Sequence, residues 1–579
     1  MLSSGPRKKN SAKLSSLAFG HSPFAIQSSS AVVVTVNTIA KSKAATSTLA
    51  ASATVRAVQS PTPSAFSSSS RPTPEKEPPR RKRPASQSEL PEGPRAKKQK
   101  SKNAAKESST PRSSRASSIR RIGPPFGSLE RPIPRICVTT EDGAVPHVSS
   151  EDVVIRVLRE QTVPKKTKKG YRAFFRNPSD LNDKSFEPDS LQLPIVEFQY
   201  PNHGASERFL LLYPWDKDDY QPVKELMRTL STIVDCYLTP AQREPFGSLS
   251  RNLISIPTED TRPASPANHG TPSEQSTPLL RILERAYHKH DGPLFIKTMN
   301  EVSSRLATLK EEMMENARAW FNANKTDEEA EEGTSSGGVP VKLWKMVLEE
   351  TYQRSVGPDV DDTKKYRSFS SETYGELNPS FISDIVHRLG LKPGKVFVDL
   401  GSGVGNCVFQ AALQSGCDAY GIEINHPVAS LSFKQKVEFT ARLRMWGLTA
   451  GKYEVLDGDF CESNEVAEWI RKADVVLVNN YIFNSELNDR LTWRFLDLRD
   501  GAKVVVLKPF WPFKRPLTGR TADTPEAVLT NVEKLEYFSD SVSWTKEPGD
   551  FYIYTKSSVR PVLVQESRTS SRASSRLSR

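Results

Sequence analysis

Hydrophobic and polar positions repeat in regular blocks over the last third of the chain. Short apolar runs predict strands at 395–400, 418–424, 452–460, 473–483 and 502–510. Amphipathic stretches between them predict helices at 378–389, 406–416, 428–447, 466–472 and 487–498. Strands that alternate with crossover helices are typical of a mainly parallel, doubly wound sheet. Two later runs, 535–544 and 551–557, predict a closing antiparallel strand pair, so the expected fold class is α/β.

The pattern before this sheet predicts two smaller ordered parts. Helices are expected at 151–160, 221–238, 279–290, 295–323 and 341–354, and a strand at 206–216. A Pro- and Ser-rich stretch between them predicts a linker. The expected boundaries are 131–240 for a small α+β unit, 241–277 for the linker, 278–355 for a helical subdomain and 356–560 for the doubly wound body.

The two ends of the chain lack such patterns. Residues 1–130 are rich in Ser, Pro and Ala and hold too few apolar residues to offset the entropy of folding, which predicts a disordered arm. Residues 1–121 contain 23 Lys and Arg against 5 Asp and Glu, which leaves 58 against 63 for the rest of the chain. A basic arm of this kind usually meets a polyanion such as nucleic acid or an acidic membrane. Residues 561–579 predict a second basic, disordered tail.

Two basic clusters in the arm indicate a nuclear import signal. They are RRKRP at 80–84 and RAKKQK at 95–100, with 11 residues between Arg83 and Arg95. That spacing suits a bipartite signal, although a solvated charge run is the alternative. The absence of acids from residues 1–74 also resembles a mitochondrial transit peptide, but Arg is sparse there. The expected location is therefore the nucleus.

The remaining composition excludes several classes of protein. No apolar stretch approaches the roughly 20 residues that cross a bilayer, so no membrane partner is expected. The cysteines are few and lack C-x-x-C spacing: Cys137, Cys236, Cys407, Cys417 and Cys461. This pattern implies neither a disulfide framework nor a zinc site, and it favours a reducing compartment. We expect no bound metal.

The stretch FVDLGSGVGN, residues 397–406, follows an apolar strand and precedes a helix. Glycines at 401, 403 and 405 permit a tight turn and the close approach of a ligand to the backbone. The dinucleotide fingerprint is G-x-G-x-x-G, whereas here the third glycine comes one position early and Asp399 precedes the first. The carboxylate of Asp399 could orient the loop or meet the cationic part of a ligand.

Polar residues also end the next three strands. Glu423 follows Gly401 by 22 residues, where an acid can accept hydrogen bonds from both ribose hydroxyls. Asp459 and Phe460 suit an adenine. The Asp459 carboxylate can accept a hydrogen bond from the adenine amino group, and the Phe460 ring can stack on the base. Asn479 ends the fourth strand and is followed by a second asparagine. Carboxyl ends of parallel strands meet at one edge, so these residues predict one nucleoside-binding cleft, with NAD still open as the ligand.

Taken together, the segments SETYGELNPSF, FVDLGSGVGNCV, YGIE, GDF, VLVNNYIF and SVSWT resemble the family called disruptor of telomeric silencing. Its members are S-adenosylmethionine-dependent histone lysine methyltransferases with the class I, seven-strand, Rossmann-like fold rather than the SET fold. The resemblance covers about residues 341–556 and extends more loosely over 200–240, as in fungal members. It implies a methyltransferase domain at 356–560.

The resemblance implies a donor site and an acceptor channel. A loop over the methionine part of S-adenosylmethionine consists of Tyr374, Gly375, Glu376 and Leu377. The donor's backbone side is surrounded by Phe397, Val398, Asp399, Leu400, Gly401, Ser402, Gly403, Val404, Gly405 and Asn406. Glu423 takes the ribose, and Asp459 and Phe460 take the adenine. Asn479 lies by the methyl-transfer point, while Phe369, Phe483 and Trp544 match aromatic residues of the lysine channel.

One position departs from the family pattern. Seven residues after Trp544 stands Phe551, where family members usually have Tyr, and Tyr552 follows. We therefore count Phe551 and Tyr552 among the candidate catalytic residues, with Tyr552 as a possible substitute for the missing hydroxyl. Ordinary packing remains the alternative for Phe369 and Phe483. An aromatic channel lowers the pKa of a lysine amine by desolvation, so no dedicated general base is required.

The resemblance implies transfer of methyl groups to a lysine in the core of histone H3, the lysine-79 mark, in chromatin and telomeric silencing and the DNA damage checkpoint. The implied partners are the nucleosome with its core histones, nucleosomal DNA held by the basic arm without sequence specificity, and, as a candidate, ubiquitin-marked histone H2B. The alternatives are a class I methyltransferase with an RNA or other acceptor, an NAD-dependent dehydrogenase, and a chromatin scaffold without activity.

Overall fold

The computed structural model describes residues 131–161, 170–217, 219–249, 277–322, 337–364, 375–512, 521–529 and 531–559. The predicted arm at 1–130, the import clusters, most of the predicted linker and the basic tail lie outside these residues. Among the predicted site residues, Phe369 and Tyr374 also lie outside them.

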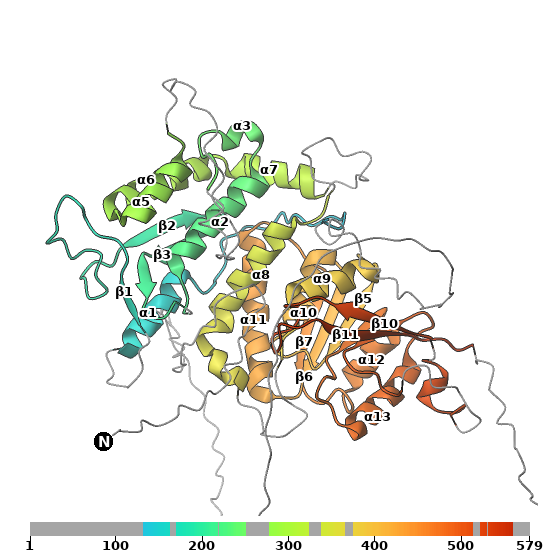
Figure 1. Cartoon of the computed structure of the whole chain (residues 1–579). Coiled ribbons are helices and arrows are strands. Elements are labelled where there is room, and N and C mark those ends of the chain that lie inside the picture. The colour runs from blue at the N-terminus through green and yellow to red at the C-terminus, as the bar shows by residue number, and fades with distance from the viewer. Residues whose placement is uncertain are drawn as a thin grey trace, which may run out of the picture. The chain divides into compact units, whose positions relative to one another are not determined.

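A seven-stranded sheet carries the predicted motifs (Figure 1). Its strands are β5 (Val396–Leu400), β6 (Asp418–Glu423), β7 (Tyr453–Asp457), β8 (Val475–Val478), β9 (Lys503–Val506), β10 (Asn531–Tyr537) and β11 (Gly549–Thr555). They lie in the order β10-β11-β9-β8-β5-β6-β7. The five strands from β5 to β9 are parallel, and β11 pairs antiparallel with β9 and with β10. This arrangement confirms the predicted class I fold.

Helices cover both faces of the sheet, as parallel strands require. One face packs against α9 (Pro379–Arg388), α10 (Asn406–Ser415) and α11 (His426–Met445), and the other against α12 (Asn464–Lys472) and α13 (Ser485–Arg494). Successive strand residues alternate between the faces, so Phe397 joins the first apolar cluster and Val398 the second. Burial on both faces explains why the strands read as uninterrupted apolar runs.

The part of the chain before the sheet contains short strands and longer helices. They are α1 (Ser150–Gln161), β1 (Tyr171–Ala173), β2 (Ile195–Gln199), β3 (Ser206–Leu210), β4 (Leu212–Pro214), α2 (Pro222–Tyr237), α3 (Pro240–Arg243), α5 (Leu279–Lys289), α6 (Gly292–Thr308), α7 (Lys310–Phe321), α8 (Val341–Ser355) and the 3₁₀ segment η1 (Gly357–Lys364).

Two predicted elements in this part are divided in the structure. The strand expected at 206–216 is β3 and β4, because the chain changes partners at Leu211: β3 pairs with β2, and β4 pairs with β1. The helix expected at 295–323 is α6 and α7, which meet at Leu309. Just after that break, the buried Lys310 ammonium donates to the carbonyls of Asn202 and Ala205, 3.1 and 2.8 Å away.

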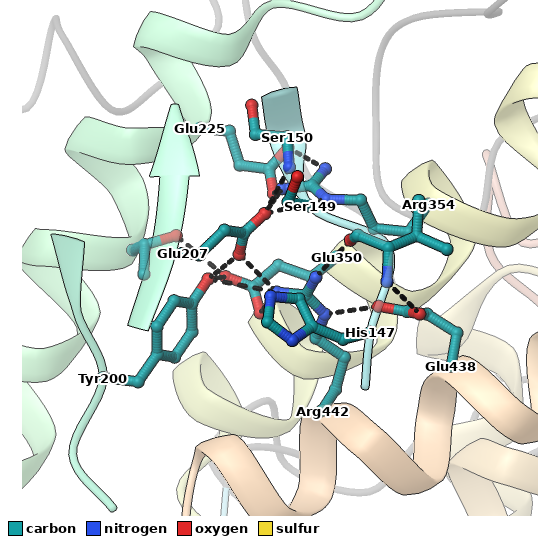
Figure 2. A network of polar contacts seen from close by, with 12 residues as sticks. His147, Ser149, Ser150, Tyr200, Glu207, Glu225, Glu350, Arg354, Glu438 and Arg442 are labelled. Carbon is teal, nitrogen blue, oxygen red and sulfur yellow. Dashed lines mark hydrogen bonds and ion pairs between the residues drawn. The ribbon is translucent and has the colours of Figure 1, made fainter. Parts of the chain in front are cut away.

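A buried network of charges joins this part to the body that contains the seven-stranded sheet (Figure 2). The Glu207 carboxylate on β3 accepts from Arg354 of α8 and from Arg442 of α11, and all three side chains are fully buried. Arg354 also donates to Glu225 of α2. Burial by itself would raise the pKa of Glu207, but the two guanidiniums outweigh burial and lower it below its ordinary value.

Glu350 forms the second centre of the network. Its carboxylate accepts from the Tyr200 hydroxyl at 2.9 Å, from Thr229 at 2.8 Å and from the Trp446 indole at 2.7 Å. Burial raises the pKa of Glu350 to about 7. The network therefore ties β3 and α2 to α8 and α11 through buried side chains.

The apolar core crosses the same boundary. Leu226 of α2, Phe295 of α6, Val347 of α8 and Phe439 of α11 all belong to one cluster of buried residues. The described residues on both sides of this boundary thus share one core.

Three further observations concern the described residues. No helix among them is long and apolar enough to cross a membrane. No group of three or more His, Cys, Asp or Glu side chains in these ranges could hold a metal ion. All five cysteines are buried and unpaired.

Candidate functional site

The predicted glycine loop lies where β5 ends and α10 begins. Gly401, Gly403 and Gly405 have φ of 88°, 57° and 91°, a left-handed backbone that side chains disfavour. The turn is held to the next strand, because the N–H groups of Gly401 and Ser402 both donate to the Ile422 carbonyl at 2.9 Å. The glycines therefore have a conformational role as well as leaving the loop open to a ligand.

Glu423, at the end of β6, anchors the middle of the loop. One carboxylate oxygen accepts from the N–H of Gly403 at 3.0 Å, and the other accepts from the N–H of Asn425 at 2.8 Å. A side chain on the neighbouring Gly421 would come within 2.7 Å of Ser402, so the close approach of the loop requires glycine there. Glu423, the residue predicted to bind the ribose, is thus fixed in position by hydrogen bonds from the backbone.

A cavity of about 410 Å³ opens at this carboxyl edge of the sheet. It is lined by Gly375, Glu376, Leu377, Asp399, Gly401, Ser402, Gly403, Val404, Asn406, Cys407, Glu423, Ile424, Asp459, Phe460, Asn479, Phe483, Asn484, Glu486, Leu487 and Arg490. Residues from the ends of four parallel strands meet in it, as expected at the switch point of such a sheet.

Asp399 is a carboxyl of the cavity wall whose pKa is raised by its surroundings. Its side chain is buried, and burial raises its pKa to about 7, partly offset by a hydrogen bond with Cys407 and reinforced by the charge of Glu423. Cys407 is itself buried, and its pKa is raised chiefly by burial. An anion at this position is therefore costly unless a cation faces it.

One end of the cavity brings together an acidic side chain, two aromatic rings and a basic side chain. Asp459 accepts from the Cys461 N–H at 2.7 Å and lies 3.5 Å from the Arg490 guanidinium of α13. The rings of Phe460 and Phe483 are nearly parallel, with centroids 6.2 Å apart. A flat ring with an exocyclic amino group matches these groups by shape and hydrogen bonding.

The two asparagines after β8 have different surroundings. Asn479 lines the cavity and donates through Nδ2 to the Gly375 carbonyl at 3.1 Å, whereas its buried Oδ1 has no hydrogen-bond partner among the described residues. Asn480 is fully buried and does not line the cavity. Its Oδ1 accepts from the N–H groups of Leu507 and Lys508, and its Nδ2 donates to the Lys508 carbonyl. Asn480 thus joins β8 to the chain after β9.

The segment that covers Asn479 is attached to the β10–β11 connection. The N–H of Glu376 donates to the Ser543 hydroxyl, and the Ser543 N–H donates to the Glu376 carbonyl, both at 2.9 Å. A side chain on Gly375 would come within 2.8 Å of the Trp544 ring. Tyr352 of α8 donates its hydroxyl to Glu376 at 3.4 Å. Residues far apart in sequence therefore form this wall.

Most of the predicted site residues meet in this cavity, and some do not. Those in the wall are Gly375, Glu376, Leu377, Asp399, Gly401, Ser402, Gly403, Val404, Asn406, Glu423, Asp459, Phe460, Asn479 and Phe483. Those absent from the wall are Phe397, Val398, Leu400, Gly405, Trp544, Phe551 and Tyr552. The first three are core residues of β5, and Gly405 is the residue just before α10.

Phe551 and Tyr552 occupy opposite faces of β11. Phe551 is fully buried and meets Phe381 of α9 edge to face, with centroids 5.1 Å apart. Tyr552 belongs to the cluster on the other face of the sheet. The structure therefore places neither side chain in the wall of the cavity, and their predicted catalytic roles stay predictions.

Sequence reasoning missed one wall of the cavity. Asn484, Glu486, Leu487 and Arg490 come from α13 and the residue before it. The amphipathic pattern of 487–498 predicted the helix, but its apolar positions indicate only the face toward the core. The side of α13 that lines the cavity carries Glu486, Leu487 and Arg490.

The chain was compared with known proteins. A family model described as "Histone methylation protein DOT1" matches residues 352–556. The "Histone-lysine N-methyltransferase, H3 lysine-79 specific" of Emericella nidulans is 32% identical over 376 residues, which cover 65% of this chain and 67% of that protein. The protein of the same name from Mycosarcoma maydis is 33% identical over 482 residues, covering 62% and 59%. That of Yarrowia lipolytica is 42% identical over 217 residues, covering 38% and 44%.

The similarity to the first two relatives reaches well beyond the segment that the family model matches. The chain spans about three fifths to two thirds of their length.

Proposed function

The chain belongs to the DOT1 family of histone methylation proteins, and on that premise we propose that it transfers methyl groups from S-adenosylmethionine to a lysine in the core of histone H3, the lysine-79 mark. The observation that carries the proposal is the cavity, where four strand ends, the glycine loop and Asn479 meet.

The cavity fits the donor chemically. The donor combines a cationic amino acid part, a ribose and an adenine, and the wall offers buried carboxylates at Asp399 and Glu423 and the acid–aromatic pair of Asp459 and Phe460. The Ser402 hydroxyl is buried without a hydrogen-bond partner among the described residues, which a ligand polar group would satisfy. Glu376 and Asp399 would hold the amino acid part, Glu423 the ribose, and Asp459 with Phe460 the adenine.

Asn479 is proposed to position the acceptor amine. When bound, the donor supplies an electrophilic methyl group on a sulfonium. The Gly375 carbonyl accepts a hydrogen bond from the Asn479 amide and so fixes it, while the buried Oδ1 has no partner among the described residues. That oxygen can accept one N–H of a neutral lysine amine, which leaves the nitrogen lone pair free for in-line attack. Desolvation in the channel and the donor's positive charge both lower the amine's pKa, so the proton leaves to solvent before transfer.

The proposal also covers the form in which the histone is methylated and the cellular location. A lysine in a folded histone core implies the whole nucleosome as substrate and the nucleus as location, which the two basic clusters of the arm support. We propose that the arm holds nucleosomal DNA through phosphates without sequence specificity. Roles in telomeric silencing and the DNA damage checkpoint, and recognition of ubiquitin-marked histone H2B, are further parts of the proposal.

The test is methylation of intact nucleosomes with labelled donor, with the modified residue located by mass spectrometry. We expect label on a core lysine of histone H3 and little label on free histone tails or on RNA. Label on RNA instead would favour the alternative, a class I methyltransferase with a nucleic-acid acceptor. Donor binding without transfer to any of these acceptors would contradict the proposal.

A further inference from the structure

The order of the sheet indicates the side from which an acceptor enters. Asp459 follows β7, Glu423 ends β6 and the glycine loop follows β5, so the proposed donor site extends over β7, β6 and β5. Asn479 follows β8, at the end of this row. The next strand edge belongs to β9, and the residue that emerges there is Lys508.

The backbone of Lys508 is held rigidly. The buried Asn480 side chain accepts from the Lys508 N–H at 2.9 Å and donates to the Lys508 carbonyl at 2.9 Å. Because both bonds come from the residue next to Asn479, Lys508 is fixed relative to the proposed methyl-transfer point.

The side chain of Lys508 belongs to a ledge of three residues, Lys508, Tyr481 and Trp544. The Lys508 ammonium lies 4.6 Å from the centre of the Tyr481 ring, and the Tyr481 ring lies 5.3 Å from that of Trp544. Trp544 in turn packs on Gly375, whose carbonyl orients Asn479. Tyr481 is 41% exposed, and Lys508 is exposed as well. A continuous series of contacts thus connects the cation to the cavity wall.

The ammonium has no counter-charge in the described structure. No carboxylate of a described residue lies within ion-pair distance of Lys508, whereas Lys395 and Lys434 at other positions of the same body are paired. An exposed cation that lies over an aromatic ring, on a hydrogen-bonded backbone and without a paired carboxylate among the described residues, is arranged to receive one from a partner.

We propose that Lys508 determines acceptor specificity by pairing with a carboxylate that neighbours the target lysine on the substrate surface. The inference rests on the proposed lysine methyltransferase function and adds a residue and a substrate feature to it. A lysine flanked by an acid is drawn in, because its carboxylate meets Lys508. A lysine in a basic surrounding is repelled by the same cation.

The first test compares Lys508→Glu, Lys508→Arg and a matched control, Lys392→Glu, an exposed lysine in the turn before β5 at the opposite edge of the sheet. With nucleosomes as acceptor, we expect Lys508→Glu to lower kcat/KM about tenfold or more, as for loss of an interfacial charge pair. Lys508→Arg should lose about twofold, and Lys392→Glu should match the wild type. Donor affinity and Tm should be equal in all four proteins. Equal kcat/KM for Lys508→Glu and Lys392→Glu would overturn the inference.

The second test is a double-mutant cycle. Each carboxylate neighbouring the modified lysine is replaced in the histone by the corresponding amide, and wild type and Lys508→Gln are assayed on each nucleosome. One histone change should lower wild-type turnover and have no further effect on Lys508→Gln. Effects that all add would contradict the pairing while leaving the methyltransferase function intact. A wild type that methylates no nucleosomal lysine would refute both proposals.

Discussion

Asp399 shows how a single carboxyl links stability to ligand binding. It ends β5 inside the apolar sheet, and burial keeps its pKa near 7, far above its ordinary value of 3.8. The carboxyl therefore stays partly protonated at neutral pH until a cation faces it. The amino group of the proposed donor would supply that cation.

We expect Asp399→Asn to stabilise the free protein at pH 8 while weakening the donor. Because the folded pKa is raised, the contribution of Asp399 to stability is complete below about pH 4 and is lost as the pH rises through about 7. The variant lacks this loss, so its Tm should exceed that of the wild type by about 2 °C at pH 8 and by less at pH 5. Thermal melting from pH 5 to 9 measures this, and donor titration should show about tenfold weaker binding. A Tm difference that is constant with pH would contradict the assignment.

Asn479 and Asn480 allow a matched comparison of neighbouring residues of one type. We expect Asn479→Ala to lower kcat about 100-fold, as for loss of an oriented polar group at a reacting centre, with donor affinity nearly unchanged. Asn480→Ala should mainly lower Tm, because it removes the bonds to Leu507 and Lys508. Single-turnover assays and melting curves separate the two effects. Unchanged turnover in Asn479→Ala would refute its proposed role.

Helix α8 connects the buried charges to the proposed donor site. One of its faces presents Glu350 and Arg354 to the network, and Tyr352 reaches Glu376 in the cavity wall. The network fixes this helix against β3, α2 and α11. The packing of the elements before the sheet therefore helps to position the cavity wall at Glu376. No described residue before Gly375 lines the cavity itself.

We expect Arg354→Met to destabilise the protein by about 3–5 kcal/mol, because it removes a guanidinium that pairs with two buried carboxylates. Glu225 is left buried without this partner, and Glu207 keeps only Arg442. The control is Arg305→Met, which breaks the exposed pair with Glu301 on α6 and should cost under about 0.5 kcal/mol. Urea denaturation measures both. Equal midpoints for the two variants would show that the network is energetically neutral.

The first described residues, from 131 onward, are hydrogen-bonded to the body that contains the seven-stranded sheet. Arg135 donates to the carbonyls of Leu413 and Thr449, and Thr139 donates to that of Gly447. These partners precede β6 and β7, so the described chain begins at the amino edge of the sheet, opposite the cavity.

Deletion of residues 1–130 should weaken nucleosome binding and flatten its salt dependence. The deleted segment carries all of the chain's net positive charge, because the remainder is net acidic, and each lost phosphate contact reduces the salt slope by about 1. Donor affinity should not change, because the cavity lies wholly within 375–490. Binding isotherms at several salt concentrations measure the effect. Equal slopes for full-length and truncated protein would refute a role of the arm in DNA binding.

Local patterns along the chain were enough to predict the sheet and much of the site. The carboxyl ends of parallel strands lie at one edge of the sheet regardless of how the connecting loops run. The positions of Asp399, Glu423, Asp459 and Asn479 in the sequence were therefore enough to assign them to one cleft. The family resemblance then named the ligand. Position along the chain could not by itself separate Asn479 from Asn480, because both follow β8. Only their tertiary contacts distinguish them: Asn479 donates to Gly375, and Asn480 bonds to the chain after β9.

The sequence by itself determined the class of fold, the glycine turn and the row of polar strand ends, because these depend on local periodicity and on a regular architecture. Tertiary structure alone decided the contacts between distant segments. Glu207 meets Arg354 and Arg442 across 147 and 235 residues, and Lys508 meets Tyr481 and Trp544. No pattern in the chain encodes such pairings, because any of the many charged residues could pair until packing brings two of them together. The packing of Phe551 against Phe381 is also of this second kind.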